Sequence, residues 1–191
     1  MSWHVRESIE VIWITVAAVW LVARLRSKPD LRVERSISRV FQLHLLIAAG
    51  ILLFSFRPHI PRLETRYLPE SVAIAVAGVV MTAFGAGFAI MARLHLGRNW
   101  SSVAKIKRDH ELIRGGPYRV VRHPIYTGLL IATLGTAIAS GQLRGLLAVP
   151  LVLLGFWLKA RSEERLLLSE FGDRYAQYRR EVTSAIVPFL L

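Results

Sequence analysis

Five apolar segments separated by charged loops constrain this chain more than any other feature of its sequence. They cover about residues 9–23, 40–56, 72–91, 125–139 and 145–158. Only the third is a clean run of the ~20 residues that an apolar helix needs to span a bilayer. Hydrophobic residues make up 53% of the 191 residues, which is unusual for a soluble domain. The pattern predicts an all-α integral membrane protein with about five transmembrane helices.

The basic residues follow the same segmentation. The chain has 25 Lys and Arg against 13 Asp and Glu. If each segment crosses the membrane once, 20 of the 25 basic residues fall on one side of the membrane. The positive-inside rule then places the N-terminus outside and the C-terminus in the cytoplasm. A nucleic-acid-binding protein would be basic without such apolar segments, so we expect membrane lipids and not nucleic acid as partners.

We interpret residues 1–191 as a single membrane domain. Residues 1–92 hold three N-terminal spans, and residues 93–191 hold a large loop, a helical hairpin and a C-terminal helix. Only SGQLRG separates the fourth and fifth segments, which predicts two antiparallel neighbouring helices. Pro150 predicts a kink in the fifth. Small residues predict close helix packing in the fourth segment (Gly128, Ala132, Gly135 and Ala139) and in the third (Gly78, Gly85 and Gly87).

Residues 159–182 read as an amphipathic helix that is interrupted near Gly172. Leu167, Phe171, Tyr175 and Tyr178 recur at helical spacing on one face. Such a helix either lies on the bilayer surface or folds back over a functional site. The chain has no cysteine, which excludes disulfides, zinc–thiolate sites and thiol nucleophiles, and we expect no metal site.

A dense polar stretch, RVVRHPIYTG (residues 119–128), lies at the start of the fourth apolar segment. Pro124 suits the first turn of a helix, and the residue before a proline avoids the helical conformation. His123 therefore marks the helix entrance. The free N–H groups of the first turn would form an anion site that faces the cytoplasm.

A second polar group, KARSEER (residues 159–165), follows the fifth segment and returns to the same side of the membrane. Glu163 and Glu164 point about 100° apart on a helix, so we expect at most one of them to face a given cavity. Ionisable groups at a membrane are expensive and indicate a functional site. The alternative is that Arg161, Arg165 and the two glutamates form ordinary exposed pairs on the helix surface.

The stretch HELIRGGPY (residues 110–118) precedes the polar entrance. Gly115, Gly116 and Pro117 mark a turn. Leu112 and Ile113 are apolar residues in a polar loop beside that turn. They either pack on the bilayer edge or sandwich a flat ring such as adenine.

Taken together, these motifs resemble a known family. GGPYRVVRHPIYTG, then a hairpin, then RSEERLLLSEFGDRYAQYRREV and, near the end of the sequence, IVPFL are similar to the isoprenylcysteine carboxyl methyltransferases and the related phospholipid N-methyltransferases. LGRNWSS (residues 96–102) also resembles the stretch after the family's preceding span. The resemblance covers about residues 94–190 and implies an integral membrane methyltransferase that uses S-adenosylmethionine without a Rossmann domain. No GxGxxG motif follows a strand pattern in this sequence.

The resemblance also implies site residues. Glu164, with Glu163, would meet the ammonium group of the cofactor. The remaining cofactor-binding residues would be His110, Leu112, Ile113, Gly116, Tyr118, His123, Pro124 and Tyr126. Asn99 and Trp100 would mark the substrate side of the loop, although a Trp at that depth is equally typical of an interface anchor.

The acceptor decides which further residues matter. A carboxylate acceptor is already ionised and needs a cationic partner, for which we favour Arg161, then Arg122 or Arg119. An amine acceptor must lose a proton, and Glu163 or a histidine is the candidate base. We expect a lipidic acceptor, most readily an isoprenylcysteine-type carboxylate, with phosphatidylethanolamine as the alternative. An NADPH-dependent membrane reductase and a non-catalytic membrane protein are the competing hypotheses.

Overall fold

The computed structural model describes residues 3–25, 30–33, 37–54, 61–97, 105–107 and 112–187. Helices dominate the described part of the chain. They are α1 (Trp3–Leu25), α2 (Ile37–Phe54), α3 (Pro61–Glu64), α4 (Val72–Leu96), the 3₁₀ helix η2 (Gly116–Arg119), α5 (Pro124–Ser140), α6 (Leu143–Phe171) and α7 (Asp173–Glu181). Two short strands, β1 (Asp30–Val33) and β2 (Lys105–Lys107), pair antiparallel.

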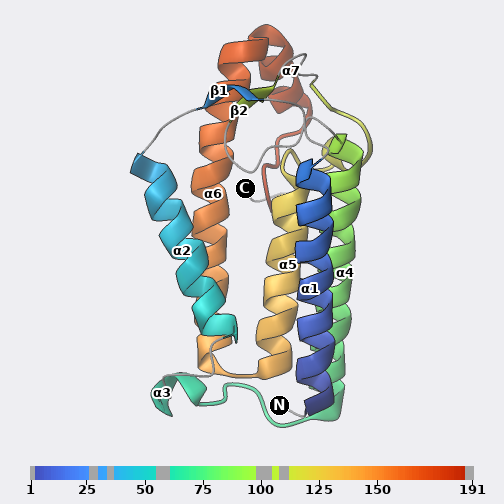
Figure 1. Cartoon of the computed structure of the whole chain (residues 1–191), viewed down its shortest axis with the longest axis vertical. Helices are drawn as coiled ribbons and strands as arrows, with labels where there is room; N and C mark the ends of the chain where they lie inside the picture. The colour runs from blue at the N-terminus through green and yellow to red at the C-terminus, as the bar shows by residue number, and fades with distance from the viewer. Residues whose placement is uncertain are drawn as a thin grey trace.

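Five long helices run along the long axis of the molecule, in alternating directions (Figure 1). α4 packs against α5, α2 packs against α6, and α1 packs against α4. The N-terminus lies at one end of this bundle, and α7 with the β1–β2 pair lies at the other (Figure 1). The strand pair was not predicted, and it joins the first charged loop to the third at one end of the bundle.

The small residues of α5 pack directly against α4, as predicted. A Cβ atom placed on Gly135 would lie 2.5 Å from the backbone nitrogen of Thr82, and one on Gly128 would lie 2.6 Å from that of Ala89. Gly85 also faces α5, whereas Gly87 faces open space. Close packing of small residues is typical of helices in lipid, where van der Waals contact drives association. The α4–α5 pair is therefore a rigid support for what lies at its end.

The boundary between the fifth span and the tail differs from the prediction. α6 is one continuous helix over residues 143–171, through Pro150 and across the expected boundary near residue 159. Residues 159–171 are mostly good helix formers, so nothing ends the helix before Gly172. There the chain breaks as predicted, because Gly172 has a φ of 50°, which favours glycine.

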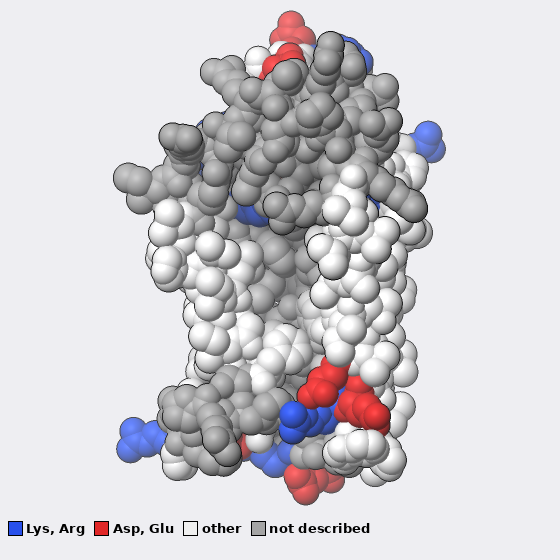
Figure 2. Space-filling view, viewed as in Figure 1, with Lys and Arg blue, Asp and Glu red and all other residues white. Residues whose placement is uncertain are grey.

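The surface agrees with a membrane setting. Two described helices, α4 and α6, have the length and apolar composition to cross a bilayer, and α5 and residues 40–54 of α2 form shorter apolar helices. Val76, Val80 and Phe84 of α4 are among the large apolar side chains that are more than half exposed. Figure 2 shows a middle zone in which the described surface is uncharged, with charged residues gathered toward the two ends.

Candidate functional site

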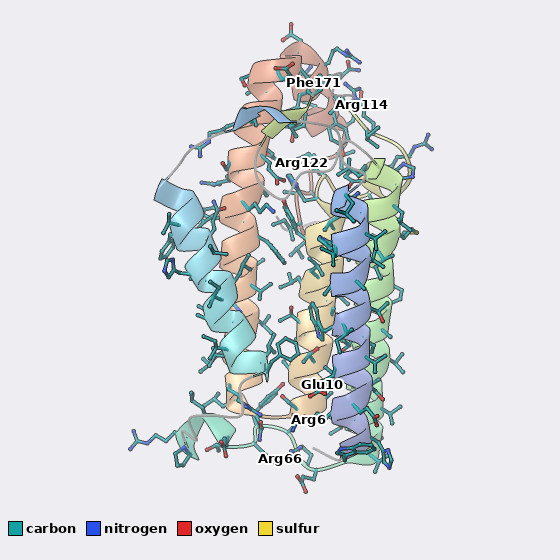
Figure 3. The ribbon with its side chains drawn as sticks, in the orientation of Figure 1. Arg6, Glu10, Arg66, Arg114, Arg122 and Phe171 are labelled. Carbon is teal, nitrogen blue, oxygen red and sulfur yellow. The ribbon has the colours of Figure 1, made fainter. Side chains whose placement is uncertain are left out.

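The entrance of α5 and the polar part of α6 meet at the end of the bundle that carries α7. Arg122 and Arg114 lie at this end, and Arg6, Glu10 and Arg66 lie at the opposite one (Figure 3). His123 precedes α5 with a non-helical backbone (φ −125°, ψ 62°), as the following proline predicts. This conformation turns the chain so that its side chain reaches α6.

Both glutamates of α6 face the same histidine. His123 Nε2 lies 3.3 Å from Glu164 Oε1, and His123 Nδ1 lies 3.6 Å from Glu163 Oε2. The expectation that at most one glutamate faces the site is therefore wrong. Two side chains about 100° apart can share one partner because the nitrogens of an imidazole lie on different edges of the ring. A protonated His123 has a donor for each carboxylate.

Tyr126, in the first turn of α5, is bonded to the same cluster. Its hydroxyl donates to Glu163, 2.7 Å from either carboxylate oxygen. Its ring stacks on His123, with centroids 5.3 Å apart, and on Phe156 of α6 at 4.9 Å. Because the ring is held on both faces, the hydroxyl has a fixed direction. Lys159 adds a cation 5.3 Å from the Tyr126 ring and 3.9 Å from Glu163 Oε1.

Glu164 is surrounded by cations. Arg122 Nε donates to Glu164 Oε1 at 2.7 Å, and both side chains are about one tenth exposed. Arg179 of α7 approaches the other oxygen of Glu164 at 3.5 Å. With His123, three basic groups face this one carboxylate. Glu163 is more accessible, with 18% of its side chain exposed.

Several of the backbone donors expected to form an anion site at the start of α5 are bonded within the protein. The N–H of His123 donates to the carbonyl of Ala185 at 2.8 Å, and Pro124 has no N–H. The N–H of Tyr126 donates to the carbonyl of His123 at 3.0 Å, within the first turn. The start of α5 thus offers fewer free donors to an anion than an ordinary helix start.

The turn before the cluster is built on one glycine. Gly116 has a φ of 57°, and a Cβ atom there would lie 2.8 Å from the ring of His95 on α4. Tyr118, next in this turn, is buried and stacks on His95 at 6.2 Å. Its carbonyl accepts a hydrogen bond from the Tyr178 hydroxyl at 2.7 Å. Burial raises the pKa of Tyr178 to about 12, so this donor keeps its proton.

α7 folds back over the site, which decides between the two interpretations of the tail. Tyr175, Tyr178 and Val182 form a buried cluster, with Leu112 and Phe171 packed against it. Leu112 therefore packs inside the protein in this structure, and Ile113 is half-buried. The face predicted from the tyrosine and leucine spacing is the face that packs.

Several other predicted residues lie elsewhere. The exposed Arg161 packs its guanidinium over the ring of Trp157 at 3.9 Å. No contact between Arg161 and His123 or the two glutamates is present in the described part of the chain. His110, Asn99 and Trp100 lie outside the described residues. Sequence reasoning missed Lys159, although its spacing of four from Glu163 is a helical contact distance.

Comparisons with known proteins identify the family of the chain. The family model described as phospholipid methyltransferase matches residues 73–174, which include η2, α5, α6 and the whole cluster. The chain belongs to the phospholipid methyltransferase family. The match confirms the resemblance that the motifs around His123 and Glu164 indicated.

Individual relatives carry a more specific name. The chain is 41% identical over 98 residues to protein-S-isoprenylcysteine O-methyltransferase of Schizosaccharomyces pombe, covering 50% of this chain and 42% of that protein. It is 32% identical over 116 residues to protein-S-isoprenylcysteine O-methyltransferase B of Arabidopsis thaliana, covering 59% and 58%. The chain thus matches about half the length of these relatives.

A solved structure has a fold similar to that of this chain. It is that of a eukaryotic intramembrane Ras methyltransferase, isoprenylcysteine carboxyl methyltransferase. The TM-score is 0.53 at 24% identity, over 83% of this chain and 55% of that protein. The helical arrangement of this chain is therefore similar to that of the solved structure.

Proposed function

We propose that this protein transfers a methyl group from S-adenosylmethionine to the carboxylate of an isoprenylcysteine-type acceptor. The observation that carries the proposal is the cluster of His123, Tyr126, Glu163 and Glu164 at one end of the apolar helices. This cluster lies within the residues that match the family model. The names of the relatives favour a carboxylate acceptor.

The site belongs at the cytoplasmic face of a membrane. We infer that α1, α2, α4, α5 and α6 each cross the bilayer once, which places the N-terminus outside. The distribution of basic residues in the sequence supports this orientation. An ionisable cluster at the end of apolar helices is where a water-soluble cofactor can meet a lipid-soluble acceptor.

The side chains present fit the charges of S-adenosylmethionine, which supplies an electrophilic methyl group when it is bound. Its ammonium group suits a carboxylate, and Glu163 is the better candidate because Glu164 already faces three basic groups. A carboxylate has about four acceptor positions, so Glu163 can keep its bond to Tyr126 and accept another donor. Stacking of Tyr126 on Phe156 keeps that carboxylate oriented.

The acceptor carboxylate needs no base, because it is ionised at neutral pH. It needs a cation to hold it, and Lys159 has the most suitable place among the described basic residues. Its ammonium lies beside Glu163 and Tyr126, and its side chain is 20% exposed. Arg122 is less suitable, because Glu164 and two backbone carbonyls hold it. Arg161, which we favoured from the sequence, points to Trp157 instead.

A phospholipid amine is the second candidate acceptor, and the description of the matching family model favours it. Methylation of an amine requires loss of a proton. Glu163 is the better placed of the two glutamates to take up this proton, because its side chain is 18% exposed and that of Glu164 is 11% exposed. The two acceptors therefore place different demands on the same carboxylate.

Calorimetry on detergent-purified protein tests the cofactor, with NADPH as the control ligand. We expect binding of S-adenosylmethionine, at least 10-fold weaker in Glu163→Gln and unchanged in Glu170→Gln, which alters an exposed residue of the same helix. Binding of NADPH alone would favour a reductase. Binding of neither ligand by folded protein would refute the proposal.

Methyl-labelled cofactor then identifies the acceptor. With a farnesylated cysteine derivative and with phosphatidylethanolamine vesicles as substrates, we expect label only in the former. A methyl ester is released by mild base, whereas an N-methyl group is not. Base-stable label in the phospholipid would instead establish the second candidate.

A further inference from the structure

The chain after α7 runs back along the entrance of α5, where Figure 1 shows it as a dark red trace beside the start of that helix. We call residues 182–186 the C-terminal strap. The family model ends at residue 174, so the strap lies outside its match. Its sequence, VTSAI, carries no charged group.

Five consecutive carbonyl oxygens of the strap accept hydrogen bonds, and the four donor atoms belong to Arg122, His123 and Thr127. The Nη1 atom of Arg122 donates to the carbonyls of residues 182 and 183. The backbone N–H of Arg122 donates to the carbonyl of residue 184 at 3.0 Å, and that of His123 donates to residue 185 at 2.8 Å. The hydroxyl of Thr127 donates to the carbonyl of residue 186.

The side chains of the strap fix its register. Val182, Ser184 and Ile186 are buried, and the residues between them are less so, which is the alternation of an extended chain. Ile186 is fully buried in the cluster that contains Tyr126 and Phe156. A shift of one residue would turn this set outward, so the pairing of carbonyls with donors has one register.

These bonds hold two residues that contact the glutamates of the site, Arg122 and His123. Arg122 binds Glu164 through Nε and the strap through Nη1. The guanidinium is planar and rigid, so the strap decides where Nε points. The bond from the His123 N–H to the strap likewise fixes the residue whose ring lies between the two glutamates.

We propose that the C-terminal strap is a positioning element of the proposed methyltransferase site, with Thr127 as its positioning residue. The strap binds no substrate. It holds Arg122 and His123 in the places that leave Glu163 open to the cofactor. The hydrogen bonds of the strap do not depend on the proposed function. The effect of the strap on cofactor binding rests on that function.

The test compares two threonines of α5. Thr127→Val keeps the shape of the side chain but removes the hydroxyl, which bonds the strap and also lies 3.3 Å from the carbonyl oxygen of His123 on its own helix. Thr133→Val is the matched control for that second bond, because Thr133 is also buried and its hydroxyl donates to the carbonyl of Leu129 four residues earlier on the same helix. Thr127→Ser restores the hydroxyl and is the rescue variant.

The first measurement is backbone amide exchange at Arg122 and His123, together with the imidazole ¹⁵N shifts of His123. We expect exchange at least 10-fold faster and displaced imidazole signals in Thr127→Val. Thr133→Val and Thr127→Ser should resemble the parent protein. Unchanged exchange and shifts in Thr127→Val would overturn the inference, and so would equal changes in Thr133→Val.

The second measurement is the dissociation constant of S-adenosylmethionine. We expect about 10-fold weaker binding in Thr127→Val, less than 2-fold change in Thr133→Val, and recovery in Thr127→Ser. If the parent protein binds the cofactor and Thr127→Val binds it equally well, the positioning role is wrong. If the parent protein does not bind it, the proposed function fails, and the exchange measurement still decides whether the strap holds the entrance of α5.

Discussion

Substitution of Gly85 by alanine tests the close packing of α4 on α5. A Cβ atom there would lie 2.4 Å from the nitrogen of Ala132 and 2.6 Å from the carbonyl oxygen of Gly128, whereas ordinary contact begins at 3.4 Å. Both neighbours are backbone atoms, so no side chain can rotate away. The two helices must separate by roughly 1 Å, and a gap of that size forfeits a quarter to a half of the dispersion energy at the affected contacts.

Overpacking of this kind costs about 1–3 kcal/mol, and the rigid neighbours place Gly85→Ala at about 3 kcal/mol. Gly87→Ala is the matched control on the same helix, because nothing lies within 4 Å of its added Cβ. That change should stabilise the helix by about 0.5–1 kcal/mol. The two variants should therefore differ by about 4 kcal/mol.

Equilibrium unfolding by SDS in detergent micelles measures both variants under the same conditions. Gly135→Ala is an independent repeat, because its Cβ would lie 2.5 Å from the nitrogen of Thr82. It should be destabilised like Gly85→Ala. If Gly85→Ala and Gly87→Ala differed by less than about 1 kcal/mol, the helices would not be as closely packed as this reasoning requires.

Three further substitutions test the site. Tyr126→Phe removes the donor to Glu163 and keeps the ring stacking, so it should destabilise the protein by about 1–2 kcal/mol in the same unfolding assay; no loss would contradict the bond. Arg122→Met and Glu164→Gln should each cost about 3 kcal/mol, because each removes the shortest ion pair of a buried charge. Their double mutant should show a coupling of at least ~1 kcal/mol, and additive effects would mean that the pair is not formed. Gly116→Ala should lower the thermal midpoint, because its φ of 57° strains any residue with a Cβ atom by about 1–2 kcal/mol; an unchanged midpoint would argue against that turn.

Much of the helical part of the site was predictable because single residues determine it. Pro124 sets the start of α5, and Gly172 ends α6, since each has a backbone preference that overrides its neighbours. The small-residue face of α5 was predictable from spacing alone, because a helix brings residues three and four apart onto one side. These features depend on local chemistry, which a sequence displays directly.

The arrangement within the site depends on contacts between distant segments, and it was less accessible. Helix geometry predicts the angle between Glu163 and Glu164, but the histidine that lies between them is about 40 residues away in the chain. Arg161 and Lys159 could not be ranked without knowing which side of α6 faces α5. The strap uses backbone carbonyls, which every sequence has, so no residue type indicates it.

The long separation between the strap and its donors has a consequence for biosynthesis. Thr127 and Ile186 are 59 residues apart. Because chains grow at about 5–20 residues per second, Ile186 is synthesised roughly 3–12 s after Thr127. During that interval the N–H groups of Arg122 and His123 are exposed to water or to other ligands. The bundle can insert before this happens, but the polar end is completed last. A nascent protein would therefore pass through a stage in which the helices are folded but Arg122 and His123 lack the strap, and synthesis of residues 182–186 would bring that stage to its end.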